Sequence, residues 1–140
     1  MTDGRDASEG DLTERSLTDS EELLYRQVHP SWVQEGVPSS QAFRPTKKDA
    51  GMLSIALGSK TTPDGAFNHH TQVLKLQSAG TWAVTVAEVA DAGLNSYEQP
   101  RDDSPDHGFI DFRELGRGQT ERSAKLLLAN ARERGCLHSP

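Results

Sequence analysis

The chain has few apolar residues and almost no cysteine, and it is too short for a second core. Its 140 residues are 34% hydrophobic and 6% aromatic, and a chain of this length usually buries one core. The single cysteine, Cys136, excludes an intramolecular disulfide and is typical of a reducing compartment. The N-terminus lacks the pattern of a signal peptide, and no apolar run reaches the length of about 18 residues that a membrane helix needs. We therefore expect a soluble, cytoplasmic protein with one domain.

Basic residues are dispersed, and the negative excess lies at the N-terminus. Residues 1–24 contain eight acidic and two basic residues, which accounts for the whole formal net charge of −6. Because phosphate binding needs clustered lysine and arginine, we expect no nucleic acid as partner, and the lack of a long apolar run leads us to expect no membrane either. High charge with few apolar residues predicts that residues 1–20 form a disordered acidic tail, followed by a single domain over residues 21–140.

The remaining chain alternates between strand patterns and helix patterns. The helix starting at Thr62 and Pro63 is predicted to run to about Gln77, and the last helix is predicted to have Thr120 as its cap and to stop at Gly135. A long polar loop is expected over residues 91–106. Trp82 is expected in the core and Trp32 at least partly exposed. Strands are predicted over residues 23–28, 37–44, 52–57, 81–89 and 107–112.

These elements predict an α+β fold with a small mixed sheet of about five strands and two main helices. Three segments resemble a family of small uncharacterised bacterial proteins. The segments are LYRQVHP at residues 24–30, SQAFRPT at residues 40–46 and HGFIDF at residues 107–112. The resemblance covers residues 24–138. It implies a bacterial source and a single compact domain, and it carries no known activity.

The order of the first elements also resembles the start of ADP-ribosyltransferase-like folds, including small NAD-degrading bacterial toxins. That resemblance implies that Arg26 holds a phosphate or ribose of NAD through its forked hydrogen bonds, and that Ser40 shapes the nicotinamide pocket. A later glutamate would stabilise the oxocarbenium-like charge, but neither Glu88 nor Glu114 lies in a motif. The alternative is structural, with Arg26 paired to a carboxylate such as Asp111.

Histidines provide the other candidate site residues. A zinc site needs three or four clustered ligands, and adjacent His69 and His70 diverge by about 100° on a helix, so no metal is expected. His70 is predicted near the centre of the buried helix face. His29 and His107 stand at strand ends, where a ring either shapes a turn or lines a polar cleft. The candidate polar cleft therefore consists of Arg26, His29, Ser40, His70 and His107.

The sequence contains no phosphate-binding loop, nucleophile elbow or paired-cysteine motif. The leading hypothesis is a non-enzymatic accessory or adaptor domain. It would act by protein–protein contact in a bacterial multi-component system, such as a defence or toxin-related one, and would need no cofactor. Two alternatives stay open: an ADP-ribosyltransferase-like domain that consumes NAD, and an immunity- or antitoxin-like inhibitor steered by charge to a basic partner.

Overall fold

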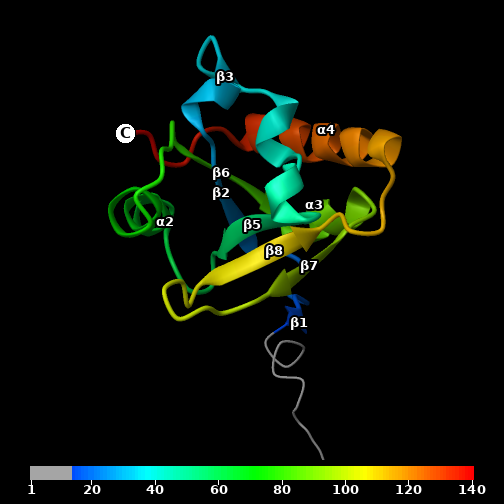
Figure 1. Ribbon diagram of the computed structural model, residues 1–140, viewed down its shortest axis with the longest axis horizontal. Coiled ribbons are helices and arrows are strands. Elements are labelled where there is room, and N and C mark those ends of the chain that lie inside the picture. Colours follow the sequence, from blue (N-terminus) through cyan, green and yellow to red (C-terminus); the bar gives the residue numbers. More distant parts are fainter. Residues whose placement is uncertain (1–13) are drawn as a thin grey trace, which may run out of the picture.

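One antiparallel sheet of six strands organises the fold of the computed structural model, which describes residues 14–140 (Figure 1). The strand order is β1-β7-β8-β5-β2-β6, and every pairing is antiparallel. A separate two-stranded ribbon pairs β3 (Val33–Gln34) with β4 (Val37–Pro38). The sheet strands are β1 (Arg15–Ser16), β2 (Leu23–Gln27), β5 (Met52–Leu57), β6 (Thr81–Thr85), β7 (Asn95–Glu98) and β8 (His107–Asp111).

Helices cover both faces of this sheet. Figure 1 shows α2 and α4 on either side of β2 and β6. The α+β class is confirmed, with six strands where about five were predicted and with antiparallel pairing throughout where a mixed sheet was predicted. No helix within residues 14–140 is long and apolar enough to cross a membrane. The helical elements are α2 (Pro63–Asn68) with its π-helical continuation η4 (His69–Val73), α3 (Val86–Asp91), α4 (Arg117–Arg134) and the 3-10 turns η1 (Pro30–Trp32), η2 (Ser40–Phe43) and η3 (Lys47–Asp49).

Strand alternation separates two apolar clusters. The larger lies on the α4 side and includes Leu24 of β2 and Leu127 of α4, and the smaller joins Tyr25 of β2 to Ala66 of α2. Successive residues of a strand point to opposite faces, which explains how neighbours in β2 serve different clusters. Trp82 is 6% exposed and belongs to the larger cluster, which confirms it as core. Trp32 is only partly buried, as predicted.

The predicted strand over residues 81–89 is wrong in its second half. β6 ends at Thr85, whose side chain accepts a hydrogen bond from the Glu88 N–H at 3.1 Å, while the Glu88 carboxylate accepts from the Thr85 N–H at 2.9 Å. This reciprocal capping box starts α3. Val86 and Val89 are both buried, and their spacing of three places them on one helix face.

The predicted strand over residues 37–44 is also mostly wrong. Only Val37–Pro38 is extended, and Ser40–Phe43 forms a 3-10 turn. Adjacent Ala42 and Phe43 are both fully buried, which a strand with one solvated face does not allow.

Three other boundaries differ from the prediction. The loop predicted over residues 91–106 contains β7, and the helix from Pro63 ends at Val73. The last helix starts at Arg117 with Gly116 as its N-cap, whereas the sequence predicted Thr120 as the cap.

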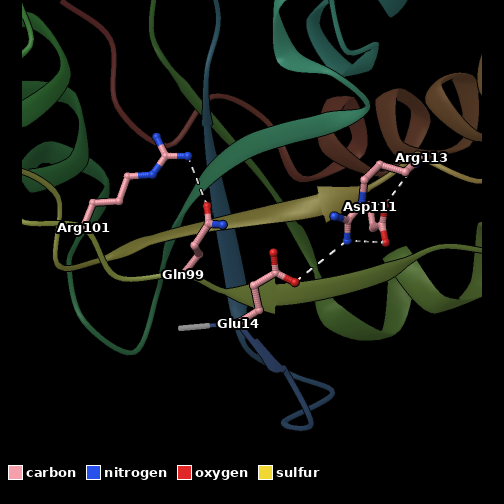
Figure 2. A network of polar contacts seen from close by, with 5 residues as sticks. All are labelled: Glu14, Gln99, Arg101, Asp111 and Arg113. Atoms are coloured by element: carbon pink, nitrogen blue, oxygen red, sulfur yellow. Dashed lines mark hydrogen bonds and ion pairs between the residues drawn. The ribbon is translucent and has the colours of Figure 1, made fainter. Parts of the chain in front are cut away.

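The sheet includes residues before position 21, where the sequence predicted the start of the domain. Arg15 pairs with Glu98 and Ser16 with Tyr97 in the β1–β7 ladder. Arg113, which follows β8, bonds the Asp111 carboxylate at 2.9 Å and lies 3.9 Å from Glu14 (Figure 2). The first thirteen residues of the predicted tail lie outside the described residues.

The edge strand β6 is covered by the segment that follows α4. The Leu137 N–H donates to the Thr81 carbonyl at 2.8 Å, and the Thr81 N–H donates to the His138 carbonyl at 2.9 Å. Arg134 donates to the Ala83 carbonyl at 2.9 Å and to Glu88 of α3. Backbone groups at this edge are therefore bonded within the chain.

Candidate functional site

The site begins where two central strands part. β2 pairs with β5 at two positions only, the last being Tyr25 with Ala56. At the next residue, Arg26, side-chain hydrogen bonds replace the backbone pairing. Its Nη1 donates to the Ser54 carbonyl at 2.9 Å, and its Nε donates to the Ala42 carbonyl at 2.7 Å. Arg26 therefore ties η2 to β5 across the gap, in place of a backbone ladder.

No carboxylate lies within ion-pair distance of Arg26 in residues 14–140. The predicted pairing with Asp111 is wrong, because Asp111 bonds Arg113 (Figure 2). Instead, Arg26 lies over the ring of Trp32, 5.4 Å from the ring centroid. Burial lowers the pKa of Arg26 to about 10, and the charge of Asp49 acts in the opposite direction. The side chain therefore stays cationic at neutral pH.

Two adjoining cavities open at this gap. The inner one has a volume of about 90 Å³ and the outer one about 710 Å³. The outer volume lies within the range of about 300–1,000 Å³ that is typical of small-molecule sites. The residues that line both cavities are Arg26, Gln27, Ser54 and His70.

The outer cavity is cationic although the chain as a whole is acidic. Arg26, Lys47, Lys48 and Lys75 line it, against the single carboxylate of Asp49. That carboxylate already accepts hydrogen bonds, at 2.7 and 3.0 Å, from the backbone and hydroxyl of the residue that caps η3. Positive charge therefore dominates the cleft.

His70 and His29 also line the outer cavity. Burial lowers the pKa of His70, and the charges of Arg26, His69 and His29 lower it further, against an opposing backbone hydrogen bond. The Nδ1 of His29 accepts from the Ser31 N–H at 3.0 Å, so this ring shapes the turn into η1, one of the two roles predicted for it.

His107 lines the inner cavity together with Ser54. Its Nδ1 lies 3.1 Å from the Gln99 carbonyl oxygen and its Nε2 lies 3.2 Å from Ser54 Oγ. Burial lowers the pKa of His107, and the charge of Arg101 acts in the same direction. Arg101 also donates to the Gln99 side chain at 3.1 Å (Figure 2).

Four of the five predicted cleft residues line these cavities, namely Arg26, His29, His70 and His107. Ser40 lines neither cavity, because it belongs to η2, which packs against α4. No group of three or more histidine, cysteine, aspartate or glutamate residues within 14–140 is placed to hold a metal ion.

The residues that the ADP-ribosyltransferase-like resemblance assigns to NAD do not lie together within residues 14–140. Neither Ser40 nor Glu88 nor Glu114 lines a cavity with Arg26. Glu88 instead forms two hydrogen bonds of 2.9 Å with Arg134.

Sequence reasoning missed Ser54 and the lysines of η3. Ser54 is the one polar residue of β5 and is exposed, whereas Leu53 and Ile55 beside it are buried. A single serine within an otherwise apolar strand was the sequence feature that could have identified Ser54 as a candidate. Nothing in the sequence of Lys47 and Lys48 indicates that η3 faces the gap between β2 and β5.

No protein-family model matches the chain, and no curated protein or solved structure matches it either.

Proposed function

We propose that the protein is a binding domain whose cleft holds a small anionic ligand, one that carries a carboxylate or phosphate group. The observation that supports this proposal is the state of Arg26. Its cation is partly buried, is held by two main-chain carbonyls, and has no carboxylate partner within residues 14–140. Withdrawing a charge from water is costly unless an opposite charge compensates it. A bound anion supplies that compensation.

The guanidinium still has donors to offer such a ligand. Arginine carries five N–H groups, and the bonds to Ala42 and Ser54 engage Nε and Nη1. A planar fork of this kind recognises carboxylate and phosphate by paired hydrogen bonds. Lys47 and Lys48 add positive charge at the same cavity, which raises the local concentration of anions around an acidic protein.

A second candidate function is the accessory role, in which the protein acts by contact with another protein. Val73 and Leu76 are 59% and 52% exposed, and Leu76 lines the outer cavity. Exposed apolar side chains beside a cationic cleft suit a partner segment that is both acidic and apolar. A bacterial multi-component system remains the setting that the sequence predicts.

Calorimetric titration with pyrophosphate at constant ionic strength tests the first candidate. We expect saturable binding to the wild type, weaker binding to Arg26→Lys, which keeps the charge and loses the fork, and weaker binding to the double variant Lys47→Gln/Lys48→Gln. The matched control is Lys125→Gln/Arg132→Gln, which removes the same two charges from exposed positions on α4 that line neither cavity. Thermal unfolding with and without pyrophosphate gives a second readout, because a ligand of the native state raises its stability.

If Arg26→Lys binds as well as the wild type, and the control on α4 loses as much affinity as Lys47→Gln/Lys48→Gln, pyrophosphate binds to net charge and not to this cleft. Absence of saturable binding to the wild type would remove the small-anion proposal and leave the protein-contact role as the better candidate.

A further inference from the structure

A serine and a histidine meet where the two cavities join. Ser54 Oγ lies 3.2 Å from His107 Nε2, and His107 Nδ1 lies 3.1 Å from the Gln99 carbonyl oxygen. Because a carbonyl oxygen only accepts, Nδ1 carries the ring proton and Nε2 accepts from the Ser54 hydroxyl. This is the orientation in which a histidine removes the proton of a serine nucleophile.

The surroundings of His107 keep its ring neutral and fixed. The residue is 9% exposed, and burial lowers its pKa, helped by the charge of Arg101 and opposed by the Gln99 bond, Asp106 and Asp103. Its backbone carbonyl also accepts from the Gln99 N–H at 2.9 Å. A neutral imidazole held on both sides is ready to act as a general base at neutral pH.

Ser54 is accessible from the cleft although it belongs to a central strand. Its side chain lies on the solvated face of β5, and the residue lines both cavities. Because an exposed hydroxyl can bond to water, Ser54 does not itself need the contact with His107, although that contact satisfies the Nε2 of the buried ring.

A cation lies beside this serine. Arg26 Nη1 donates to the Ser54 carbonyl at 2.9 Å, so the guanidinium is a neighbour of the residue that would attack. Fixed donors next to the nucleophile stabilise the negative charge that develops on a substrate carbonyl oxygen.

We propose that Ser54 and His107 form a nucleophile–base pair that hydrolyses a carboxylic ester bearing an anionic group. Ser54 Oγ attacks the ester carbon while His107 Nε2 takes the hydroxyl proton. The tetrahedral intermediate then releases the alcohol, which receives that proton from His107. Water attacks the acyl-serine with His107 again as base, and the acid leaves as Ser54 regains its proton. The requirement for an anionic substrate rests on the proposed function of the cleft.

Labelling with a fluorophosphonate probe tests the pair, because such probes react with activated serines. We expect one label per chain on Ser54, located by peptide mass spectrometry, and no label on Ser54→Ala. In His107→Gln the labelling rate should fall by about 100-fold or more, since a general base contributes a factor of about 10²–10⁴. The matched control is Ser104→Ala, because Ser104 also lines the inner cavity and should leave the rate unchanged.

Turnover of two esters tests the substrate class. The p-nitrophenyl monoester of succinate carries a carboxylate, whereas p-nitrophenyl butyrate has an acyl chain of the same length without charge. The wild type should prefer the succinate ester by about 10-fold or more in kcat/KM, which corresponds to about 1.4 kcal/mol. Lys47→Gln/Lys48→Gln should lose this preference and keep the label on Ser54.

The failure of this inference is distinguishable from the failure of the proposed function. Ser54→Ala should still bind pyrophosphate, because the cationic side chains remain. Suppose that the wild type binds pyrophosphate but either takes no label on Ser54 or is labelled no faster than His107→Gln. This result overturns the nucleophile–base pair and leaves the anion site intact. A label on Ser54 without pyrophosphate binding and without preference for the charged ester supports the pair and overturns the anion site.

Discussion

Replacing Arg26 by methionine should destabilise the free protein by about 2 kcal/mol. The change keeps an unbranched side chain and removes two charge-assisted hydrogen bonds, of 2.7 and 2.9 Å, to the carbonyls of Ala42 and Ser54. Bonds of this kind contribute about 1.5–3 kcal/mol each, or about 3–6 kcal/mol together. Against this, the lowered pKa of Arg26, about 10, indicates that burying the cation costs on the order of 3 kcal/mol. The difference is a net loss of about 0–3 kcal/mol, and losing the cation's contact with the Trp32 ring adds about 0.5–1 kcal/mol, which gives an expected loss of about 2 kcal/mol.

Urea denaturation followed by tryptophan fluorescence measures this loss, and the melting temperature should fall by about 8 °C. The stability of Arg26→Lys should lie between those of the wild type and Arg26→Met, because an ammonium group keeps the charge but cannot make both hydrogen bonds in the planar geometry of a guanidinium. If Arg26→Met proves as stable as the wild type, the bridge from η2 to β5 contributes nothing to stability, and the reasoning about this buried cation is refuted.

Three further predictions concern the core, an ion pair and pH. Trp82→Ala should lower the free energy of unfolding by about 3–5 kcal/mol in urea denaturation, because Trp82 is 6% exposed; a loss below about 1 kcal/mol would contradict its place in the core. Arg134→Gln should cost about 1–2 kcal/mol in the same assay, since it breaks the part-buried pair with Glu88, and a neutral result would show that this pair is dispensable. Burial lowers the pKa values of His70 and His107 below their ordinary value of 6.5, so the unfolded chain binds protons first as the pH falls. The free energy of unfolding should therefore be highest above about pH 6.5 and decrease below it. If the stability of His107→Gln decreases as steeply with falling pH as that of the wild type, His107 does not contribute to this pH dependence.

Much of the fold follows from local patterns in the sequence. The apolar strand β5, the Thr62–Pro63 helix start and the apolar stripe of α4 are local features, and all three were predicted close to their observed positions. The errors arise where tertiary burial or capping overrides propensity. Valines of high strand propensity fold as α3, because Thr85 and Glu88 cap a helix and both valines reach the core from one helix face.

The site was harder to predict, because it depends on a gap between two strands. Arg26 was identified as the decisive residue, but its partners are main-chain carbonyls, which leave no trace in side-chain patterns. Ser54 and His107 are separated by 53 residues along the chain and meet only through the β5–β8 register. Such a meeting depends on long-range pairing, so the sequence offered the histidine alone as a candidate.

The closed edge at β6 limits how this protein can recognise a partner. Many domains bind extended peptides by strand addition, in which the peptide lengthens the sheet through backbone hydrogen bonds at an open edge. Here the groups that such a peptide would use at Thr81 and Ala83 are already bonded by Leu137, His138 and Arg134. Recognition at this side would first require the segment after α4 to detach. While that segment is in place, a peptide cannot lengthen the sheet at these positions of β6.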